Sequence, residues 1–442
     1  MTNILSLLNS FLWGVPALLL ILTVGLYLSL RLHFIQLRFL PKALKHFFSG
    51  LKPGAEKTGF RELCTALAAT VGTGNLVGVA GAICLGGPGA VFWMWLCGIL
   101  GMVTKYAEAT LAVRYRICGE NGFLGGPMYT MEQGLGRNWK PMAACYSLFG
   151  LIASFGVGNA AQVNAVVTGI RGVLPNCSAQ LLGILLAAVI GTLLFGGAKS
   201  VGRAAEILVP FAAAGYILLC LGVLILRAEA VPRALSAIIQ GAFSPKAVTG
   251  GVLGSGFRAL CIGCSRGVFT NEAGMGTAAI AHGGAEVAHP VQQGLLGIVE
   301  VFLDTIVICT LTALVVLVSG VSIPYGNDMG AVLTQSAFSS VYGTAAAVFL
   351  AIALCLFAVA TVLGWGLYGA RCAQYLFGDR IWKAYAAAQT LMVLTGAVLD
   401  TGLVWQFSET VNGLMVIPNL ITLAALSPEV VRLTKEYKES GG

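Results

Sequence analysis

Long apolar runs follow one another along the chain, separated by short stretches that hold most of its charged residues. Most runs reach the roughly 20 residues that a helix needs to cross a bilayer, and none shows the apolar–polar alternation of an outer-membrane strand. We predict about eleven spanning helices, at residues 8–31, 60–85, 90–115, 141–170, 179–197, 203–227, 254–283, 293–319, 340–375, 381–400 and 406–426. The expected fold class is therefore an all-α, multi-pass membrane protein.

Composition supports this class. Of the 442 residues, 57% are hydrophobic and only 10% are charged, whereas soluble domains carry about 25% charged residues. The 58 glycines suit close helix packing and helix breaks in lipid. The twelve cysteines are scattered through apolar segments, which is typical of small buried residues and not of a disulfide framework. Cys261 and Cys264 have the spacing of a redox or metal pair, but without a second pair we expect neither use.

Lysine and arginine set the expected orientation, because loops that stay in the cytoplasm are enriched in both. With the N-terminus outside and the C-terminus in the cytoplasm, nineteen of the 26 fall on the cytoplasmic side. Arg171, Arg227, Arg233 and Lys246 would lie outside. This asymmetry accounts for the net charge of +8 without a nucleic-acid partner. The basic stretch 33–51 is partly amphipathic, so we expect it along the cytoplasmic lipid surface of the cell membrane.

The second apolar run contains an unusual polar interruption. Residues 70–75 (TVGTGN) lie near the middle of the apolar segment 63–85. Two glycines and an asparagine weaken a helix there, and lipid offers no partners to the backbone groups that a break would release. Irregular backbone at this depth is tolerated where it lines a cavity or holds a ligand. The interruption therefore predicts the binding site of a transporter.

A second interruption occurs at a similar position in the later part of the chain. Residues 267–276 (GVFTNEAGMG) follow a Leu-Cys pair at 260–261, just as the first interruption follows Leu-Cys at 63–64. Five helices per half would give the halves opposite orientations, as in many secondary transporters. We divide the chain into an N-terminal helix with a basic segment (1–59), a first half (60–227), an external connection (228–253), a second half (254–426) and a cytoplasmic tail (427–442).

Three motifs resemble one transporter family. Residues 62–82 (ELCTALAATVGTGNLVGVAGA), 86–95 (GGPGAVFWMW) and 266–282 (RGVFTNEAGMGTAAIAH) are similar to the alanine or glycine:cation symporter family, and the resemblance covers nearly the whole chain. It implies a LeuT-type fold, with a five-plus-five inverted repeat preceded here by one extra helix. It also implies uptake of small neutral amino acids coupled to sodium, or in some members to protons.

The resemblance also implies a substrate site at the two interruptions. Residues 71–75 are similar to the Val-Gly-Leu-Gly-Asn run of neurotransmitter:sodium symporters, and the N–H groups at the start of a half-helix suit a substrate carboxylate. Carbonyls near 267–270 would accept the ammonium, while the amide of Gln162 and the rings of Phe269 and Trp365 would complete the pocket. The predicted substrate ligands are Thr73, Gly74, Asn75, Gln162, Phe269, Thr270, Asn271 and Trp365.

Alternatives remain at several of these positions. The glycines could simply allow close packing, as in Gly74-x-x-x-Gly78. Asn271 could bind the substrate or satisfy the broken backbone, and Gln162 could make only an interhelical hydrogen bond. Trp365 could serve packing alone.

The sodium site is implied in the same way. Carbonyls at the end of the first half-helix suit a cation, and the fold adds a hydroxyl and a carbonyl from the third-from-last helix. The predicted ligands are the carbonyls of Ala68, Val71 and Ala358 and the hydroxyl of Thr361. Some relatives of the fold have two adjacent hydroxyl residues where this chain has Ala360 and Thr361, so one ligand is left open.

Other polar residues within or near the spans allow several readings. For Glu272 we favour pairing with Arg266 over a protonatable role, since a buried carboxylate is usually paired or functional. Lys105 and Glu108 have the spacing of a helix pair. We expect Glu300 and Asp304 to be paired with neighbours or exposed near the inner mouth, and His282 and His289 to be exposed in a loop.

The sequence thus predicts a sodium-coupled symporter of small neutral amino acids, alanine or glycine, that works by alternating access. The alternatives are a proton-coupled carrier, a carrier of a larger neutral amino acid such as glutamine, and a channel. No catalytic triad, paired-carboxylate site or metal-ligand cluster emerges, so we expect no enzyme activity and no cofactor besides the transported sodium ion. We expect no obligate protein partner.

Overall fold

The computed structural model describes residues 12–13, 15–51, 58–119, 122–244, 256–399 and 402–441, the side chains of 15, 58 and 402–409 excepted. Parts of the predictions fall outside these residues. They are the first residues of the first span, Lys52, Lys57, Lys246, the last part of the external connection, residues 254 and 255 of the seventh span, residue 400 of the tenth span and the last residue of the tail.

Each predicted run coincides with one helix or with consecutive helical segments. The segments are α2 (Val15–Arg31), α3 (Ile35–Arg38), α4 (Leu40–Gly50), α5 (Thr58–Thr70), η1 (Gly74–Gly78), α6 (Val79–Gly86), α7 (Gly89–Arg114), α8 (Pro127–Thr130), η2 (Met131–Leu135), η3 (Arg137–Trp139), α9 (Lys140–Phe155), η4 (Gly156–Ala160), α10 (Ala161–Val173), α11 (Ala179–Phe195), α12 (Ala198–Leu226), η5 (Ala228–Ala230), α13 (Val231–Phe243), α15 (Gly256–Asn271), α16 (Thr277–His282), α17 (Pro290–Val301), η6 (Phe302–Cys309), α18 (Thr310–Val318), α19 (Gly330–Tyr342), α20 (Ala345–Phe377), η7 (Asp379–Ile381), α21 (Trp382–Gly396), α22 (Gly402–Ala425) and α23 (Ser427–Glu439).

Within the described residues, five helices are long and apolar enough to cross a membrane, or seven if each of two bent pairs counts as one span. The protein is a multi-pass membrane protein, and the count of eleven spans stays a prediction. A short antiparallel hairpin was not predicted; β1 (Ile117–Gly119) pairs with β2 (Gly122–Leu124) in the loop after α7. The predicted run 340–375 also divides, because α19 ends just before Gly343, whose φ is 61°.

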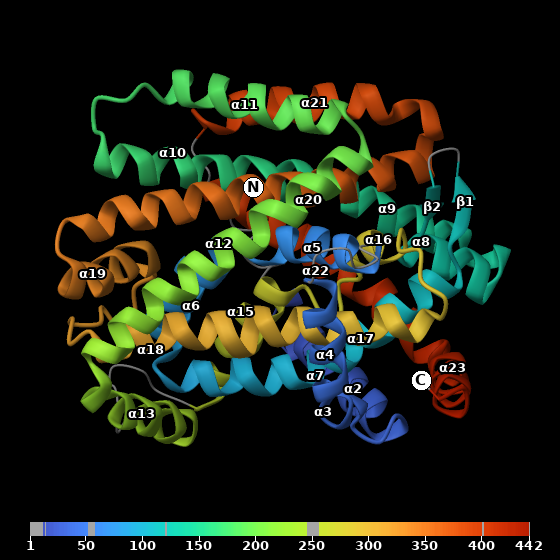
Figure 1. Cartoon of the computed structure of the whole chain (residues 1–442), viewed down its shortest axis with the longest axis horizontal. Helices are drawn as coiled ribbons and strands as arrows, with labels where there is room; N and C mark the ends of the chain where they lie inside the picture. Colours follow the sequence, from blue (N-terminus) through green and yellow to red (C-terminus); the bar gives the residue numbers. More distant parts are fainter. Residues whose placement is uncertain are drawn as a thin grey trace.

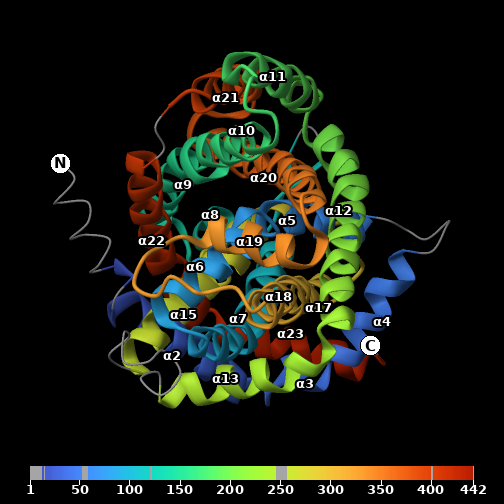
Figure 2. The same ribbon diagram turned by 90° about the vertical axis from the view of Figure 1, so that its left-hand side faces the viewer.

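The helices form two groups that meet around α5. In one group, α7 packs against α15 and α17; in the other, α20 packs against α9 and α10, and α11 packs against α21 (Figure 1). Helix α12 runs along the side of both groups and contacts α5 and α20 (Figure 2). Helix α5 contacts α12, α16 and α20. The first predicted interruption therefore lies where the two groups meet.

His289 shows how the sequence starts one of these helices. Its Nδ1 accepts a hydrogen bond from the Val291 N–H at 3.2 Å, and the Gln292 side chain accepts one from the His289 N–H at 3.3 Å. Pro290 occupies the first helical position, where no N–H is needed. Burial lowers the pKa of His289, which favours the neutral ring that can accept this bond. His289 is therefore a helix cap and is half-buried, not a freely exposed loop residue.

Candidate substrate and ion site

The first break separates α5 from η1, and the two flanking helical segments bend by 51°. The last regular bond of α5 runs from the Val71 N–H to the Leu67 carbonyl at 2.8 Å. In a continuous helix the next N–H, that of Gly72, would bond the Ala68 carbonyl. Here the Gly72 N–H donates to Oδ1 of Asn75 at 2.8 Å instead. The Asn75 side chain therefore releases the Ala68 carbonyl for another partner.

The residues after Gly72 begin the next helical segment. The Asn75 N–H donates to the Gly72 carbonyl at 3.2 Å. The Thr73 hydroxyl donates to Oε1 of Gln162 at 3.1 Å. The N–H groups of Thr73 and Gly74 thus lie at the positive end of the half-helix that continues as α6, beside the amide of Gln162.

Thr361 of α20 faces this break. A Cβ atom on Gly72 would lie 2.7 Å from the Thr361 hydroxyl oxygen, so only glycine leaves room for that hydroxyl. One turn later, a Cβ on Gly364 would lie 2.8 Å from the Cβ of Ala69, which shows how closely α20 approaches α5. The hydroxyl hydrogen of Thr361 is directed to the Phe357 carbonyl at 2.9 Å, which leaves lone pairs of its oxygen available to a cation.

The second break, residues 272–276, joins α15 to α16 and has a different geometry. Glu272, Gly274 and Gly276 have φ values of 54°, 93° and 78°. The Ala273 N–H donates to Oδ1 of Asn271 at 3.0 Å, and the Gly274 N–H donates to Oε1 of Glu108 at 2.9 Å. In a continuous helix these N–H groups would bond the carbonyls four residues earlier.

Those carbonyls belong to Phe269 and Thr270, in the last turn of α15. They are released from helical bonding because side chains accept the two N–H groups instead. The two breaks also lie side by side, since a Cβ on Gly74 would lie 3.1 Å from Cγ2 of Thr270 and 3.7 Å from the Phe269 ring. The structure thus brings the start of the half-helix after one break next to released carbonyls of the other.

A cavity of about 610 Å³ opens above this junction. Thr73, Gly74 and Phe269 line it, whereas Gln162, Thr270 and Trp365 are not among its lining residues. At the cavity wall, Nη2 of Arg266 forms an ion pair with Oδ2 of Asp328 at 3.1 Å. Segments η1, α10, α15, α19 and α20 supply the other walls.

The expected pairing of Arg266 with Glu272 is wrong. Arg266 pairs with Asp328, and Oε2 of Glu272 accepts a hydrogen bond from the Thr277 hydroxyl at 2.5 Å. A separation of six residues puts the two side chains on different faces of a helix with 3.6 residues per turn. Glu272 also follows the end of α15, so its side chain is carried into the second break.

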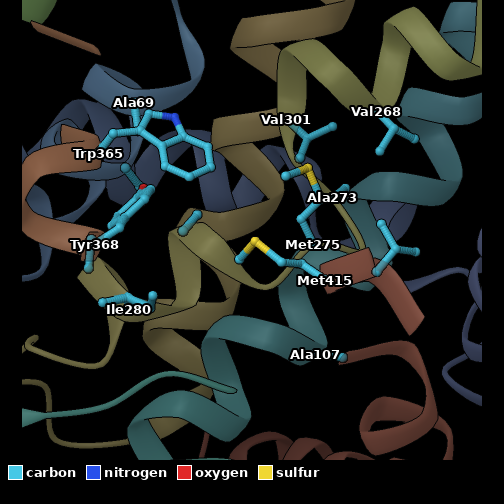
Figure 3. Packing of buried hydrophobic residues seen from close by; sticks show 14 of the residues in the cluster. Ala69, Ala107, Val268, Ala273, Met275, Ile280, Val301, Trp365, Tyr368 and Met415 are labelled. Atoms are coloured by element: carbon cyan, nitrogen blue, oxygen red, sulfur yellow. The ribbon is translucent and has the colours of Figure 1, made fainter. Parts of the chain in front are cut away.

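Trp365 is fully buried on α20. Its ring lies against Tyr368 at a centroid distance of 5.7 Å, with Ala69 of α5 next to the indole (Figure 3). On its other side it packs directly on Gly158 of η4, where a side chain would not fit. Trp365 therefore fills the space between α20, η4 and α5.

Several charged residues inside the spans are buried and paired across helices. Nζ of Lys105 lies 3.3 Å from Oε1 of Glu300, and Oε2 of Glu300 lies 2.8 Å from Nε2 of His282. Glu108 accepts from Nδ2 of Asn419 at 2.7 Å. The predicted pair of Lys105 with Glu108 is therefore wrong, because partners on other helices surround α7. The exposed loop position predicted for His282 is also wrong; α16 carries it into the core, where the ring is fully buried.

Asp304 is paired with neighbours, as expected, and is buried, but sequence reasoning did not connect it with the two breaks. Its Oδ1 accepts from Nδ2 of Asn75 at 2.7 Å, and its Oδ2 accepts from the Thr305 hydroxyl at 2.9 Å. Nδ2 of Asn271 donates to the same Thr305 oxygen at 2.9 Å. The signal was present as a carboxylate in the middle of an apolar run, which is usually functional or paired.

Metal and redox chemistry find no support in the described part of the chain. It contains no group of three or more His, Cys, Asp or Glu residues that could hold a metal ion, and all twelve cysteines are free. Cys261 and Cys264 do not pair, and the Cys264 thiol donates to the Trp93 carbonyl at 3.7 Å.

Comparisons with known proteins show the family and the fold of the chain. The model of the sodium:alanine symporter family matches residues 1–441. The chain is 43% identical to the sodium/alanine symporter AgcS of Methanococcus maripaludis, over 99% of this chain and 97% of that one. It is 38% identical to a probable sodium/glutamine symporter, GlnT of Bacillus subtilis, over 98% and 90%. The crystal structure of MhsT in complex with L-phenylalanine has the same LeuT-type fold, with a TM-score of 0.59 at 15% identity over 86% of this chain and 98% of that one.

Proposed function

The chain belongs to the sodium:alanine symporter family, and on that basis we propose that it couples inward movement of sodium to uptake of a small neutral amino acid, alanine or glycine. One observation carries the proposal. Two adjacent helix breaks bring the N–H groups at the start of one half-helix next to carbonyls released from helical bonding at the other, and Thr73, Gly74 and Phe269 of the two breaks line an open cavity. A zwitterion needs both kinds of group within the length of one small molecule.

The substrate would lie across the two breaks. Its carboxylate would accept from the N–H groups of Thr73 and Gly74, where the dipole of the following half-helix favours an anion. Its ammonium would donate to the carbonyls of Phe269 and Thr270, which α15 no longer uses. Gln162 would act indirectly, because its side-chain oxygen accepts a hydrogen bond from the Thr73 hydroxyl.

The side chain of the substrate would meet aromatic residues. Phe269 would cover it from the cavity side, and Trp365 would limit the depth of the pocket from below. In this arrangement Asn75 and Asn271 shape the breaks by binding backbone N–H groups, so we assign them that role in place of direct substrate contact.

Sodium would bind on the other side of the first break. The carbonyls of Ala68, Val71 and Ala358 and the hydroxyl of Thr361 are the proposed ligands. The released Ala68 carbonyl and the contact between Gly72 and Thr361 support this assignment. Carbonyl and hydroxyl oxygens are hard ligands that suit an alkali cation.

The transport cycle would alternate access to this site. We propose that residues 60–227 and 254–426 are inverted halves of a LeuT-type fold, and that the group around α7 rocks against the group around α20. In the predicted orientation the 610 Å³ cavity opens to the outside. Closing it would bring the walls that carry Arg266 and Asp328 over the bound substrate.

The test is uptake of radiolabelled alanine into proteoliposomes, with and without an inward sodium gradient. Accumulation that needs sodium, and that excess unlabelled glycine competes away, is the expected result. Accumulation driven instead by a proton gradient, or of glutamine in preference to alanine, would replace the ion or the substrate in the proposal. Equilibration without accumulation under every gradient would indicate a channel and would contradict symport.

A further inference from the structure

Asp304 on η6 joins the two breaks through a continuous chain of hydrogen bonds. One carboxylate oxygen accepts from the Asn75 amide at 2.7 Å, and the other accepts from the Thr305 hydroxyl at 2.9 Å. The Thr305 oxygen in turn accepts from the Asn271 amide at 2.9 Å. Asn75, Asp304, Thr305 and Asn271 are all buried. We call these four residues the relay.

The far end of each asparagine holds one backbone N–H. Oδ1 of Asn75 accepts from Gly72 at 2.8 Å, and Oδ1 of Asn271 accepts from Ala273 at 3.0 Å. Each bond diverts an N–H from its helical acceptor and so releases one carbonyl, that of Ala68 in the first break and that of Phe269 in the second. The same device is used twice, and the relay connects its two copies.

The chemistry of a carboxylate fixes the direction of every bond in the relay. An asparagine amide has an accepting end and a donating end, whereas an ionised carboxylate only accepts. Asp304 therefore attracts the donating end of Asn75 directly, and it orients the Thr305 hydroxyl so that Thr305 accepts from Asn271. With both NH₂ groups held toward Asp304, both amide oxygens face the backbone. A neutral group at this position would not impose that direction on both sides.

We propose that Asp304 is a positioning residue that sets both asparagine amides and thereby couples the shape of the sodium-binding break to the shape of the ammonium-binding break. This inference rests on the proposed function, because it assigns sodium to the first break and the substrate ammonium to the second. Sodium that holds the Ala68 carbonyl in place would stabilise the Gly72–Asn75 bond. Through the relay, the same sodium ion would then also stabilise the orientation of Asn271 and the release of the Phe269 carbonyl.

The measurable quantity is the ratio of alanine dissociation constants without and with sodium, with choline as the replacement ion. Coupling between sites of this kind is typically about 5–150-fold. We expect a wild-type ratio of at least about 10, and a ratio below about 3 for Asp304→Asn. Thr312→Val, on α18 directly after η6, removes another buried hydroxyl that bonds Tyr216 at 2.8 Å and should leave the ratio unchanged. Equilibrium binding of radiolabelled alanine to the purified full-length protein measures all three.

Two further variants separate positioning from a general loss of structure and from direct ion binding. Asn75→Asp in the Asp304→Asn background exchanges acceptor and donor, so that every bond from Gly72 to Thr305 can form again, and the ratio should recover to within about 3-fold of wild type. Asn271→Ala keeps the carboxylate but cuts the relay at its other end, so it should lower the ratio as well.

The outcomes are distinguishable. A wild-type ratio of 1 would contradict the sodium coupling of the proposed function, and the relay with it. A normal wild-type ratio that Asp304→Asn preserves would overturn the relay alone. A loss in Asp304→Asn that the double variant does not recover, or an unchanged ratio in Asn271→Ala, would also overturn it.

Discussion

The break after α5 and the break after α15 differ in length and in the partners of their backbone. The first spans three residues, none with positive φ, whereas the second spans five, of which Glu272, Gly274 and Gly276 have positive φ. In the second break, Asn419 donates to the Gly274 carbonyl at 2.9 Å and Tyr146 donates to the Met275 carbonyl at 2.9 Å.

The second break is thus held by side chains from several helices, while the first depends mainly on Asn75, whose side chain accepts the Gly72 N–H. The N–H groups of Thr73 and Gly74 lie at the positive end of the following half-helix, where a helix start favours an anion, so we expect them to bind a ligand. The comparison suggests a division of work, in which the first break supplies binding groups that change partners and the second supplies a fixed frame.

The largest effect should come from filling the junction between the breaks. Gly74→Val places methyl groups against Thr270 and Phe269, since a Cβ alone would lie 3.1 Å from Cγ2 of Thr270. Overpacking costs up to about 3 kcal/mol, which corresponds to a loss of about 100-fold. Sodium-driven alanine uptake should fall by about that factor, while the protein still inserts into the membrane.

Gly78→Ala is the matched control for this change, because no atom lies within 4 Å of the added Cβ. Its uptake should stay near wild type. Normal uptake by Gly74→Val would remove the carboxylate from the first break. A large loss in Gly78→Ala would instead favour a pure packing role for the glycines.

A smaller and more selective effect is expected at the sodium side of the first break. Thr361→Ala removes a hydroxyl that faces Gly72, and a bond to a charged group contributes about 1.5–3 kcal/mol. The sodium concentration for half-maximal uptake should rise about 10–100-fold, while the preference between alanine and glycine stays the same. Thr390→Ala removes a comparable hydroxyl, which donates to Ala386 on α21, and should leave the sodium response unchanged. An unaltered response in Thr361→Ala would exclude it from the ion site.

Sequence reasoning located the first break because its signal is local. Gly72, Gly74 and Asn75 lie within four residues, and a helix weakened at one point needs no knowledge of the rest of the fold. The helices could be predicted for the same reason, since apolar length is a property of each segment. The apolar run 340–375 shows the limit, because hydropathy does not register the turn at Gly343 that separates α19 from α20.

The partners of buried polar groups could not be predicted in this way. Asp304 is separated from Asn75 by 229 residues, and Lys105 chooses Glu300 on another helix over Glu108 on its own. Spacing along one helix predicts only neighbours on that helix, and not those on the helices packed against it. His282 was misplaced for the same reason, since its burial depends on where the second break directs α16.

At the second break a substitution should affect stability more than binding. Gly276 has φ of 78°, and an added Cβ would lie 2.6 Å from Oδ1 of Asn419. A left-handed conformation costs a residue with a side chain roughly 1–2 kcal/mol, so Gly276→Ala should unfold at a lower temperature. Alanine affinity of the folded fraction should stay within about 2-fold of wild type.

Gly326→Ala introduces similar backbone strain, with φ of 93°, at a place where nothing lies within 4 Å. It should destabilise the protein less than Gly276→Ala, and the difference measures the crowding at the second break. Thermal unfolding followed by tryptophan fluorescence, together with alanine binding, checks both variants. Unchanged stability with weakened binding would show that the second break takes part in ligand chemistry beyond its role as a frame.

The smallest effect is expected at the ion pair beside the cavity. Arg266 lies on the helix that leads to the second break, and Asp328 lies over Gly81 of α6, which follows the first. Their side chains are 24% and 47% exposed, and exposed pairs contribute about 0–1 kcal/mol. Asp328→Asn keeps the size of the side chain and removes the charge, so the half-saturating alanine concentration should change by less than about 5-fold.

Because salt screens exposed charges, choline chloride should diminish any difference between Asp328→Asn and wild type in alanine uptake at constant sodium. Glu429→Gln breaks a partly exposed pair with Arg114, away from the cavity, and should not alter uptake. A change above about 10-fold in Asp328→Asn that persists in high salt would exceed what an exposed pair can contribute. It would mean that the cavity walls next to both breaks bind the substrate directly. The second break, which follows α15, would then be part of the binding site and not only a fixed frame.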